Sequence, residues 1–483
     1  MPQARDKNIT GQIFVNSCVL AALLAMQTFT FSLGFSRLSV FYAAIGAALL
    51  VFNRTQFNQA LPKMRTFGRV LMVFALIFAL MHIARESLDS VAFGRDVRDG
   101  VRLALVEAMT AGALCVFALS YRRRGGMRYF LATVALGLLS YVAINVFLEA
   151  SGWLQGSVEL GFQSRYVDGA LRWMPPLTKS NGLFSLLNRY AIALALLIIA
   201  FYWRDTPSAI RLALAVSLVP GIWAAIQLEH RAVIIPVLVA PLAYLFTRLK
   251  LPALLPTAML TAMVLVPIVV GVGWWRTAVV PLIPDVVFRM SGDASSINDL
   301  SGRESIYDYG IEYMTQSQMG LLGDGPVFRD SFPGFRSDTR TDYLEDANRL
   351  VGSPQTFAFH NGFLDLVIPY GPMLAAGFLG IFAIAIVVLS RSAARLETRD
   401  DATLGLIHLA VIFSLNTFDS GFSDFNIIFL ALFGTVLAIA ATTSGCSTRP
   451  SPVRIQSVLP RFVTPVRHGG RPVPVLSSSA KRL

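Results

Sequence analysis

Residues 360–389 read HNGFLDLVIPYGPMLAAGFLGIFAIAIVVL, an apolar segment with a single carboxylate, Asp365. A helix rises about 1.5 Å per residue, so crossing a bilayer core of about 30 Å takes roughly 20 apolar residues. This segment is therefore long enough to span a membrane. It follows a mostly polar stretch that begins at Asp285 and ends in the residues from His360 to Asp365. The chain is thus divided into apolar spans and one large polar loop.

The composition of the whole chain is likewise strongly apolar. Hydrophobic residues make up 54% and charged residues 14% of the 483 positions, and the mean hydropathy is +0.59. These values exclude a soluble domain of this length. The sequence predicts an all-α polytopic membrane protein with about twelve transmembrane helices and one large, partly helical periplasmic loop. The apolar runs lie near residues 13–34, 38–52, 70–85, 101–120, 130–149, 184–203, 212–229, 232–247, 257–275, 360–389, 402–418 and 425–443.

Basic residues mark alternate connections between these runs. With the N-terminus inside, the inner loops hold Arg54, Lys63, Arg65, Arg69, Arg122, Arg123, Arg124, Arg128, Arg204, Arg211, Arg248, Lys250, Arg391, Arg395 and Arg399. The positive-inside rule then predicts that both termini are cytoplasmic and that the large loop is periplasmic. The formal net charge of +12 is therefore interpreted as a topology signal, and no nucleic-acid partner is expected.

The pattern divides the chain into three regions. Residues 1–211 are expected to form N-terminal transmembrane helices, with an interfacial periplasmic segment near 151–183 that holds two tryptophans. That segment is either a wall of a lipid-binding cleft or a loop anchored by its aromatic residues. Residues 212–443 are expected to form a second transmembrane region that includes the periplasmic loop 276–359. Residues 444–483 are predicted to be a basic, Pro/Ser-rich disordered cytoplasmic tail.

A helix is predicted inside the polar loop. Ser301 and Glu304 have the Ser-x-x-Glu spacing of a capping box, so a helix should start there. Its buried face is expected to contain Ile306, Tyr309, Gly310 and Tyr313. Arg303 would lie in the first turn, where its guanidinium and the unpaired backbone N–H groups point at the same place. We therefore expect an anion site at Arg303.

Other ionisable residues stand at or inside predicted spans. Glu229, His230 and Arg231 join the seventh and eighth runs with almost no loop, either as a solvated corner or as part of a site. His360 opens the tenth run, either as a hydrogen-bonded helix cap or as a functional group. Glu107, inside the fourth run, either binds an ion or proton or simply reaches the membrane interface or a Ser/Thr partner.

No metal site is expected. The five histidines are far apart in the sequence, and His408 is expected to pack against a neighbouring polar group. A cluster of acidic residues in the large loop matches no calcium-loop spacing, so we interpret it as a solvated acidic surface. These residues are Asp338, Asp342, Glu345 and Asp346.

Three motifs carry a resemblance to a known family. They are Ser301-Gly-Arg-Glu304, Gly320-Leu-Leu-Gly-Asp-Gly325 and His360-Asn-Gly-Phe-Leu-Asp-Leu-Val-Ile-Pro-Tyr-Gly371. In their order and shared outer location, they resemble motifs of the O-antigen ligase and polymerase superfamily of bacterial envelope enzymes. The resemblance covers roughly residues 212–389. Arg231 occupies the place of a further family arginine, although His230 stands where the family usually has a small hydroxyl residue.

The resemblance implies a fold of about twelve helices and a glycosyl-transfer reaction. The donor would be an undecaprenyl-diphosphate-linked glycan, transferred to a sugar hydroxyl at the periplasmic face of the bacterial inner membrane. Neither a nucleotide sugar, a cofactor nor a metal would be needed. The implied roles are the diphosphate for Arg231 and Arg303 and the acceptor proton for His360, with substrate contacts from His230, Asn361 and Asp365.

Several alternatives stay open at this point. A ligase would transfer the glycan to the lipid A-core, and a polymerase would transfer it to another lipid-linked glycan; the resemblance favours the ligase. A lipid-linked glycan transporter would also be polytopic, but such proteins usually carry internal repeats, and none is found here. Membrane lipids are expected partners in every case, and contact with other polysaccharide assembly proteins is left open.

Overall fold

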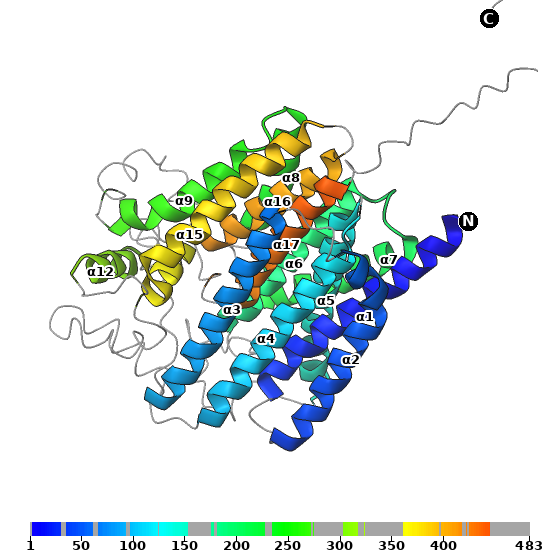
Figure 1. The fold of residues 1–483 in the computed structure, drawn as a ribbon, viewed down its shortest axis with the longest axis horizontal. Coiled ribbons are helices and arrows are strands. Elements are labelled where there is room, and N and C mark those ends of the chain that lie inside the picture. Colours follow the sequence, from blue (N-terminus) through cyan, green and yellow to red (C-terminus); the bar gives the residue numbers. More distant parts are fainter. Residues whose placement is uncertain are drawn as a thin grey trace, which may run out of the picture. The chain divides into compact units, whose positions relative to one another are not determined.

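The computed structural model describes most of the predicted spans and one helix of the large loop. The described residues are 2–29, 35–60, 66–92, 97–123, 125–152, 175–177, 181–227, 234–271, 303–316, 361–395, 398–417 and 425–444, with Trp274, Gly323 and Phe422. Within these ranges the chain is helical nearly throughout and contains no strand (Figure 1). The predicted tail belongs to a separate unit that starts at Cys446, and it lies outside the described residues.

A helix overlaps each predicted apolar run. These helices are α1 (Pro2–Phe29), α2 (Phe35–Ala60), α3 (Thr66–Ala92), α4 (Val97–Ser120), α5 (Gly126–Ala150), α6 (Asn181–Phe201), α7 (Ser208–Gln227), α8 (Ile234–Arg248), α9 (Leu254–Gly271), α15 (Gly362–Ala393), α16 (Arg399–Thr417) and α17 (Phe425–Ser444). A further helix, α12 (Arg303–Gln316), lies in the large loop. Among the described helices, six are long and apolar enough to cross a membrane. The all-helical prediction is thus confirmed there, while the full set of twelve spans stays a prediction.

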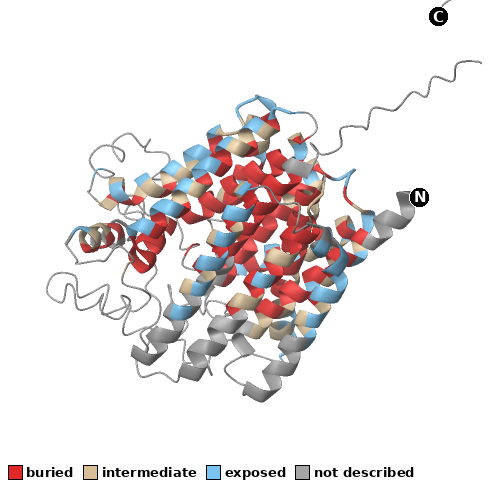
Figure 2. Ribbon diagram, viewed as in Figure 1, coloured by how far each residue is buried: buried red, intermediate tan, exposed pale blue. Residues whose placement is uncertain are grey.

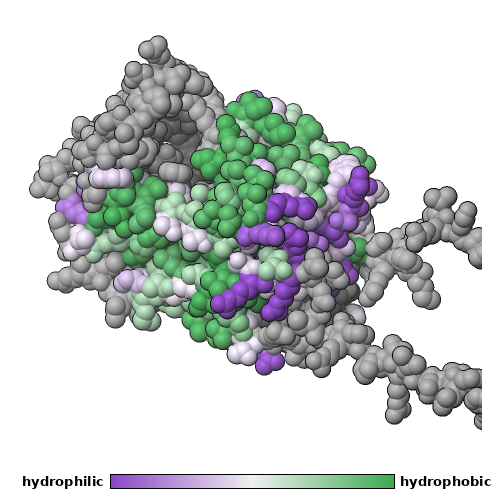
Figure 3. Space-filling model, turned by 90° about the horizontal axis from the view of Figure 1, so that it is seen from above, coloured by the Kyte–Doolittle hydropathy of each residue, from purple (hydrophilic) through white to green (hydrophobic). Residues whose placement is uncertain are grey.

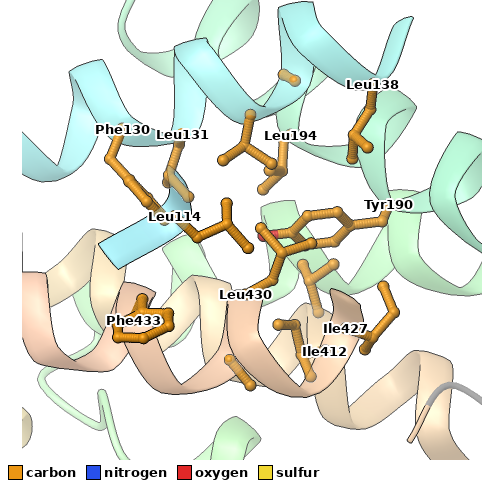
Figure 4. Close-up of a cluster of buried hydrophobic side chains, with 14 of the residues drawn as sticks. Leu114, Phe130, Leu131, Leu138, Tyr190, Leu194, Ile412, Ile427, Leu430 and Phe433 are labelled. Carbon is orange, nitrogen blue, oxygen red and sulfur yellow. The ribbon is translucent and has the colours of Figure 1, made fainter. Parts of the chain in front are cut away.

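The helices differ in how far they are surrounded. Residues of α5, α6, α16 and α17 are buried on nearly every side (Figure 2). Their core side chains come from helices far apart in sequence, with α4 and α5 facing α16 and α17 around Tyr190 of α6 (Figure 4). By contrast, α3, α7, α8 and α15 expose large apolar side chains along one face. Exposed apolar faces of this size suit contact with lipid.

Buried polar side chains join the N-terminal helices. Asn16 on α1 and Asn53 on α2 exchange hydrogen bonds of 2.9 and 3.2 Å. Gln12 donates to Asn53 Oδ1 at 2.8 Å, and Asn16 also donates to the hydroxyl of Tyr121 at 3.0 Å. Such bonds hold helices together where lipid offers no hydrophobic driving force. We therefore assign these residues a structural role.

One end of the bundle brings together the described parts of three predicted inner loops. Asp401, near the start of α16, accepts hydrogen bonds from the N–H groups of Gly125 and Met127 at 2.8 and 3.0 Å, and so caps α5. Burial raises the pKa of the Asp401 carboxyl, and these two donors oppose that shift. Arg128 pairs with Asp205 of the α6–α7 connection at 3.6 Å. These contacts bring the starts of α5 and α16 and the end of α6 together.

This basic end also carries exposed charge. Arg204, Arg248, Lys250, Arg391 and Arg395 are exposed. Figure 3 shows hydrophilic residues gathered beside a broad apolar surface. The described parts of three loops that the positive-inside rule assigns to one side, at Arg128, Asp205 and Asp401, therefore share one end of the bundle. Which side of a membrane that end faces stays a prediction.

Candidate functional site

The opposite end of the bundle is organised by Asn361. Its Oδ1 accepts hydrogen bonds from the N–H groups of Phe363 and Leu364 at 2.9 and 3.3 Å, so Asn361 is the N-cap of α15. Its Nδ2 donates to the carbonyls of Met263 on α9 and Thr417 on α16, each at 3.0 Å. These four bonds use the full capacity of the amide. Asn361 thereby ties the start of α15 to α9 and α16.

The residues after Asn361 are packed just as closely. A Cβ on Gly362 would lie 2.5 Å from Oδ1 of Asn416, so a larger residue would not fit without displacing α16. Asp365 is 2% exposed and Asn361 is 0% exposed. The structure thus gives Asn361 a positioning role for the chain at His360, which directly precedes it. That Asn361 and Asp365 contact substrate stays a prediction.

Helix α15 is broken in its first third. Gly371 has φ 84° and ψ 160°, and Pro369 and Pro372 flank it. The segment from Gly362 to Tyr370 is buried except at Phe363, and it lies beside α12 at an angle to the rest of α15 (Figure 1). The apolar run 360–389 was predicted to be one continuous span, and the break at Gly371 was not predicted. The signal for the break was the Pro-Tyr-Gly-Pro sequence, since sharp kinks arise at Pro and Gly.

Gly323, in the glycine-rich sequence after α12, contacts this break. A Cβ on Gly323 would lie 2.3 Å from the backbone nitrogen of Gly371 and 2.7 Å from the carbonyl oxygen of Ile368. Gly323 also has φ +71°, a conformation that side chains disfavour. Pro372 has no N–H for the Ile368 carbonyl, so that carbonyl loses its helical partner at the point where Gly323 lies. Gly323 can approach α15 this closely only because it has no Cβ, and Gly371 opposite it has the positive φ that favours glycine.

Helix α12 is fastened to the C-terminal end of α9. The predicted capping box starts the helix within two residues of its observed first residue, Arg303. A Cβ on Gly271 of α9 would lie 3.0 Å from the backbone of both Tyr307 and Asp308, so the two helices touch at their main chains. Helix α12 also contacts α15. Helix α12 is therefore held at Gly271, the last residue of α9, while Asn361 at the start of α15 is bonded to Met263, eight residues before that end.

The buried face of α12 is partly as expected. Gly310 and Tyr313 are buried, as predicted, while the side chains of Ile306 and Tyr309 lie outside the described residues. Tyr307 is fully buried and was missed. Tyr307, Gly310 and Tyr313 follow each other at three-residue spacing, which is the helical signal that would have found it.

Three polar residues inside the spans have structural partners. His408 lies 3.2 Å from the hydroxyl of Tyr190, which confirms that it packs against a polar group. Asn145 accepts a hydrogen bond from the N–H of Leu177 at 2.7 Å, and the hydroxyl of Tyr141 donates to the Leu177 carbonyl. This fixes one point of the segment 151–183 against α5. Glu107 is buried on α4 at 7% exposure.

One charged residue in a span, Arg189 on α6, was not among the residues singled out from the sequence. It is 4% exposed, and its Nε donates to the carbonyl of Ser185 at 3.3 Å. An isolated arginine inside an apolar run is itself a signal of function, as for Glu107. It would have been found by weighing every charged residue between 184 and 203.

Several predicted site residues are not described. His230, Arg231 and His360 lie outside the described residues, and so does the side chain of Arg303. Within the described part of the chain, no three His, Cys, Asp or Glu residues form a group that could hold a metal ion. The acidic residues from Asp338 to Asp346 lie outside it. No protein-family model matches the chain, and a search of curated proteins finds no similar sequence.

Proposed function

We propose that the protein is an integral-membrane glycosyltransferase of the O-antigen ligase type. It transfers an undecaprenyl-diphosphate-linked glycan to a sugar hydroxyl, and its acceptor is the lipid A-core. The reaction takes place at the periplasmic face of the bacterial inner membrane. The observation that carries this proposal is the attachment of both α12, which begins at Arg303, and the Asn361-capped start of α15 to α9.

The residue types suit the bonds that change. The bond between the donor sugar and the diphosphate breaks, and a bond from that sugar carbon to the acceptor oxygen forms. Arg303 and Arg231 stabilise the charge that develops on the departing diphosphate, because guanidinium groups bind phosphate oxygens in pairs. His360 accepts the proton of the acceptor hydroxyl, since imidazole has a pKa near neutrality. Undecaprenyl diphosphate leaves as the second product.

The location suits a lipid-anchored donor. Asn361 is bonded to α9 and α16, and Gly323 is packed against the break in α15, so these two described points on either side of the loop's last part lie against the spans. This end lies opposite the basic end at Asp401 and Arg128. A donor whose polyprenyl chain stays in the bilayer can then present its diphosphate at the rim of the bundle.

A lipid-linked glycan transporter is the second candidate, and the break in α15 favours it. Transporters use broken helices, but at a site near the bilayer midplane. Gly371 lies twenty residues before Arg391, which stands at the basic end. Twenty helical residues cover about 30 Å, the thickness of the hydrocarbon core. The break therefore belongs near the outer boundary and not in the middle, which favours the enzyme.

The acceptor distinguishes a ligase from a polymerase. We expect a deletion strain to show bare lipid A-core on a gel, while full-length polymer accumulates on the undecaprenyl carrier. Complementation with the wild-type chain should restore the ladder of polymer on the core. A strain that keeps a single repeat on the core but loses the ladder would identify a polymerase and contradict the ligase assignment.

A further inference from the structure

The end of α8 carries exposed positive charge next to an exposed apolar stripe. The stripe consists of Leu238, Leu242, Leu245 and Leu249, which are 44 to 58% exposed. They follow each other at helical spacing, so they lie along one face. Arg248 stands three residues after Leu245, on the same side of the helix, and is exposed. The stripe is about 16 Å long, close to half the thickness of a hydrocarbon core, which is what one leaflet supplies.

The guanidinium of Arg248 is held in place by aromatic rings. Its Nε donates to the hydroxyl of Tyr244 at 3.1 Å, and its Nη2 donates to the same oxygen. Its Cζ lies 5.0 Å from the centre of the Tyr244 ring, and that ring stacks on Phe201 of α6 with a centroid distance of 4.2 Å. A guanidinium has about five N–H donors, so several remain for a ligand. Holding the side chain in one position before binding reduces the entropy that binding would remove.

Lys250, which follows α8, has a backbone conformation that favours glycine. Its φ is 63°, and within the described part of the chain no other residue except glycine has a positive φ. The N–H of Lys250 donates to the carbonyl of Thr247 at 3.2 Å, and the N–H of Leu251 donates to the carbonyl of Phe246 at 2.9 Å. This pair of bonds closes many helices, usually with glycine at the position of Lys250. Lysine here accepts strain that glycine would avoid, and such strain is found where a side chain has a function.

The positive charge at the end of α8 is not neutralised by a carboxylate. Among the described residues, the ion pair at this end of the bundle joins Arg128 to Asp205, and neither Arg248 nor Lys250 has a carboxylate within ion-pair distance. Asp400 of α16 attracts Arg248 only from farther away. Positive charge is therefore left at the point where the leucine stripe ends. Cations at the boundary of an apolar surface attract anionic lipid headgroups.

We propose that the end of α8 binds an anionic phospholipid. The lipid phosphate contacts Arg248 and Lys250, and an acyl chain lies along Leu238, Leu242 and Leu245. Such a lipid matches both features of the surface. A soluble anion would leave the leucines uncovered, and a zwitterionic lipid would bring its own cation to a place that already has two. The inference goes beyond the proposed function and does not depend on it.

The test is lipid binding to the full-length protein in neutral detergent, measured by native mass spectrometry. The dissociation constants of phosphatidylglycerol and phosphatidylcholine with the same acyl chains are compared. The wild type should bind phosphatidylglycerol about 10- to 30-fold more tightly. Arg248→Gln and Lys250→Gly should each weaken the binding of phosphatidylglycerol about fivefold, the effect of one cation near an anionic surface. Neither variant should change the binding of phosphatidylcholine.

Two controls separate lipid binding from folding and from general charge. Glycine suits the φ of 63° at position 250, so Lys250→Gly should unfold at the wild-type temperature or above it in phosphatidylcholine nanodiscs. Arg391→Gln removes an exposed charge from the same basic end, but from α15. It should bind phosphatidylglycerol like the wild type.

Each other result counts against the inference. Equal affinity of the wild type for the two lipids would overturn it, and so would wild-type affinity for phosphatidylglycerol in Arg248→Gln or in Lys250→Gly. A loss in Arg391→Gln as large as that in Lys250→Gly would show attraction to the whole basic end and overturn the site at α8. Displacement of the lipid by an equal concentration of glycerol 3-phosphate would show an anion site that does not use the leucines, and overturn a lipid as its occupant.

Discussion

Replacing Arg303 with lysine is expected to lower the rate of glycan transfer about 100- to 1,000-fold, with normal insertion and folding. Lysine keeps the positive charge but loses the planar fork that binds two phosphate oxygens at once. Arg303 is the first residue of α12, where backbone N–H groups and the helix dipole also favour an anion. The charge on the diphosphate grows as the glycosidic bond breaks, so the loss should appear mainly in kcat.

The control is Arg289→Lys, in the same predicted loop but outside the three motifs. It should transfer glycan at the wild-type rate, because Arg289 lies outside the motifs and the lysine keeps its positive charge. The measurement is initial rate at saturating donor with purified protein. Full activity of Arg303→Lys would remove Arg303 from the site, and equal losses in both variants would indicate a general charge effect.

Replacing His360 with alanine should lower transfer about 100- to 10,000-fold, the contribution of a positioned general base. His360 directly precedes Asn361, whose four hydrogen bonds fix the start of α15 to α9 and α16. The wild-type kcat/KM should fall at acidic pH, because a protonated imidazole cannot accept the proton of the acceptor hydroxyl. The residual activity of His360→Ala should lack that dependence.

The comparison variant is His468→Ala, in the predicted tail. It should keep both the rate and the pH profile of the wild type. A His360→Ala variant with an unchanged profile would mean that another group accepts the proton. In that case the role of His360 would be limited to the start of α15.

The spans were predictable because each one is a long local signal. The apolar runs at 130–149 and 184–203 recur as α5 and α6 with shifts of a few residues at their ends. The capping box at Ser301 likewise lies within four residues of sequence and marks the start of α12. The contacts of Arg128 with Asp205 and of Asp401 with Gly125 join loops that the alternation of basic residues had assigned to the same side, although the contacts themselves were not predicted.

Contacts between distant segments were not predictable in the same way. The approach of Gly323 to Gly371 depends on the path of the whole loop, and no pattern around Gly323 specifies its partner. The four bonds of Asn361 involve Met263 and Thr417, which are far away in sequence. Arg189 differs, since its charge was visible in the sequence and only its burial required the structure.

The most direct test of the central claim is a reaction with purified full-length protein in nanodiscs, a lipid-diphosphate-linked glycan and lipid A-core. The reaction is run with and without a chelator. The proposal predicts that free undecaprenyl diphosphate and glycan-bearing lipid A-core appear in equal amounts, and that the chelator has little effect. Movement of the intact donor across the bilayer with no cleavage of the sugar–diphosphate bond would contradict the proposal and identify a transporter.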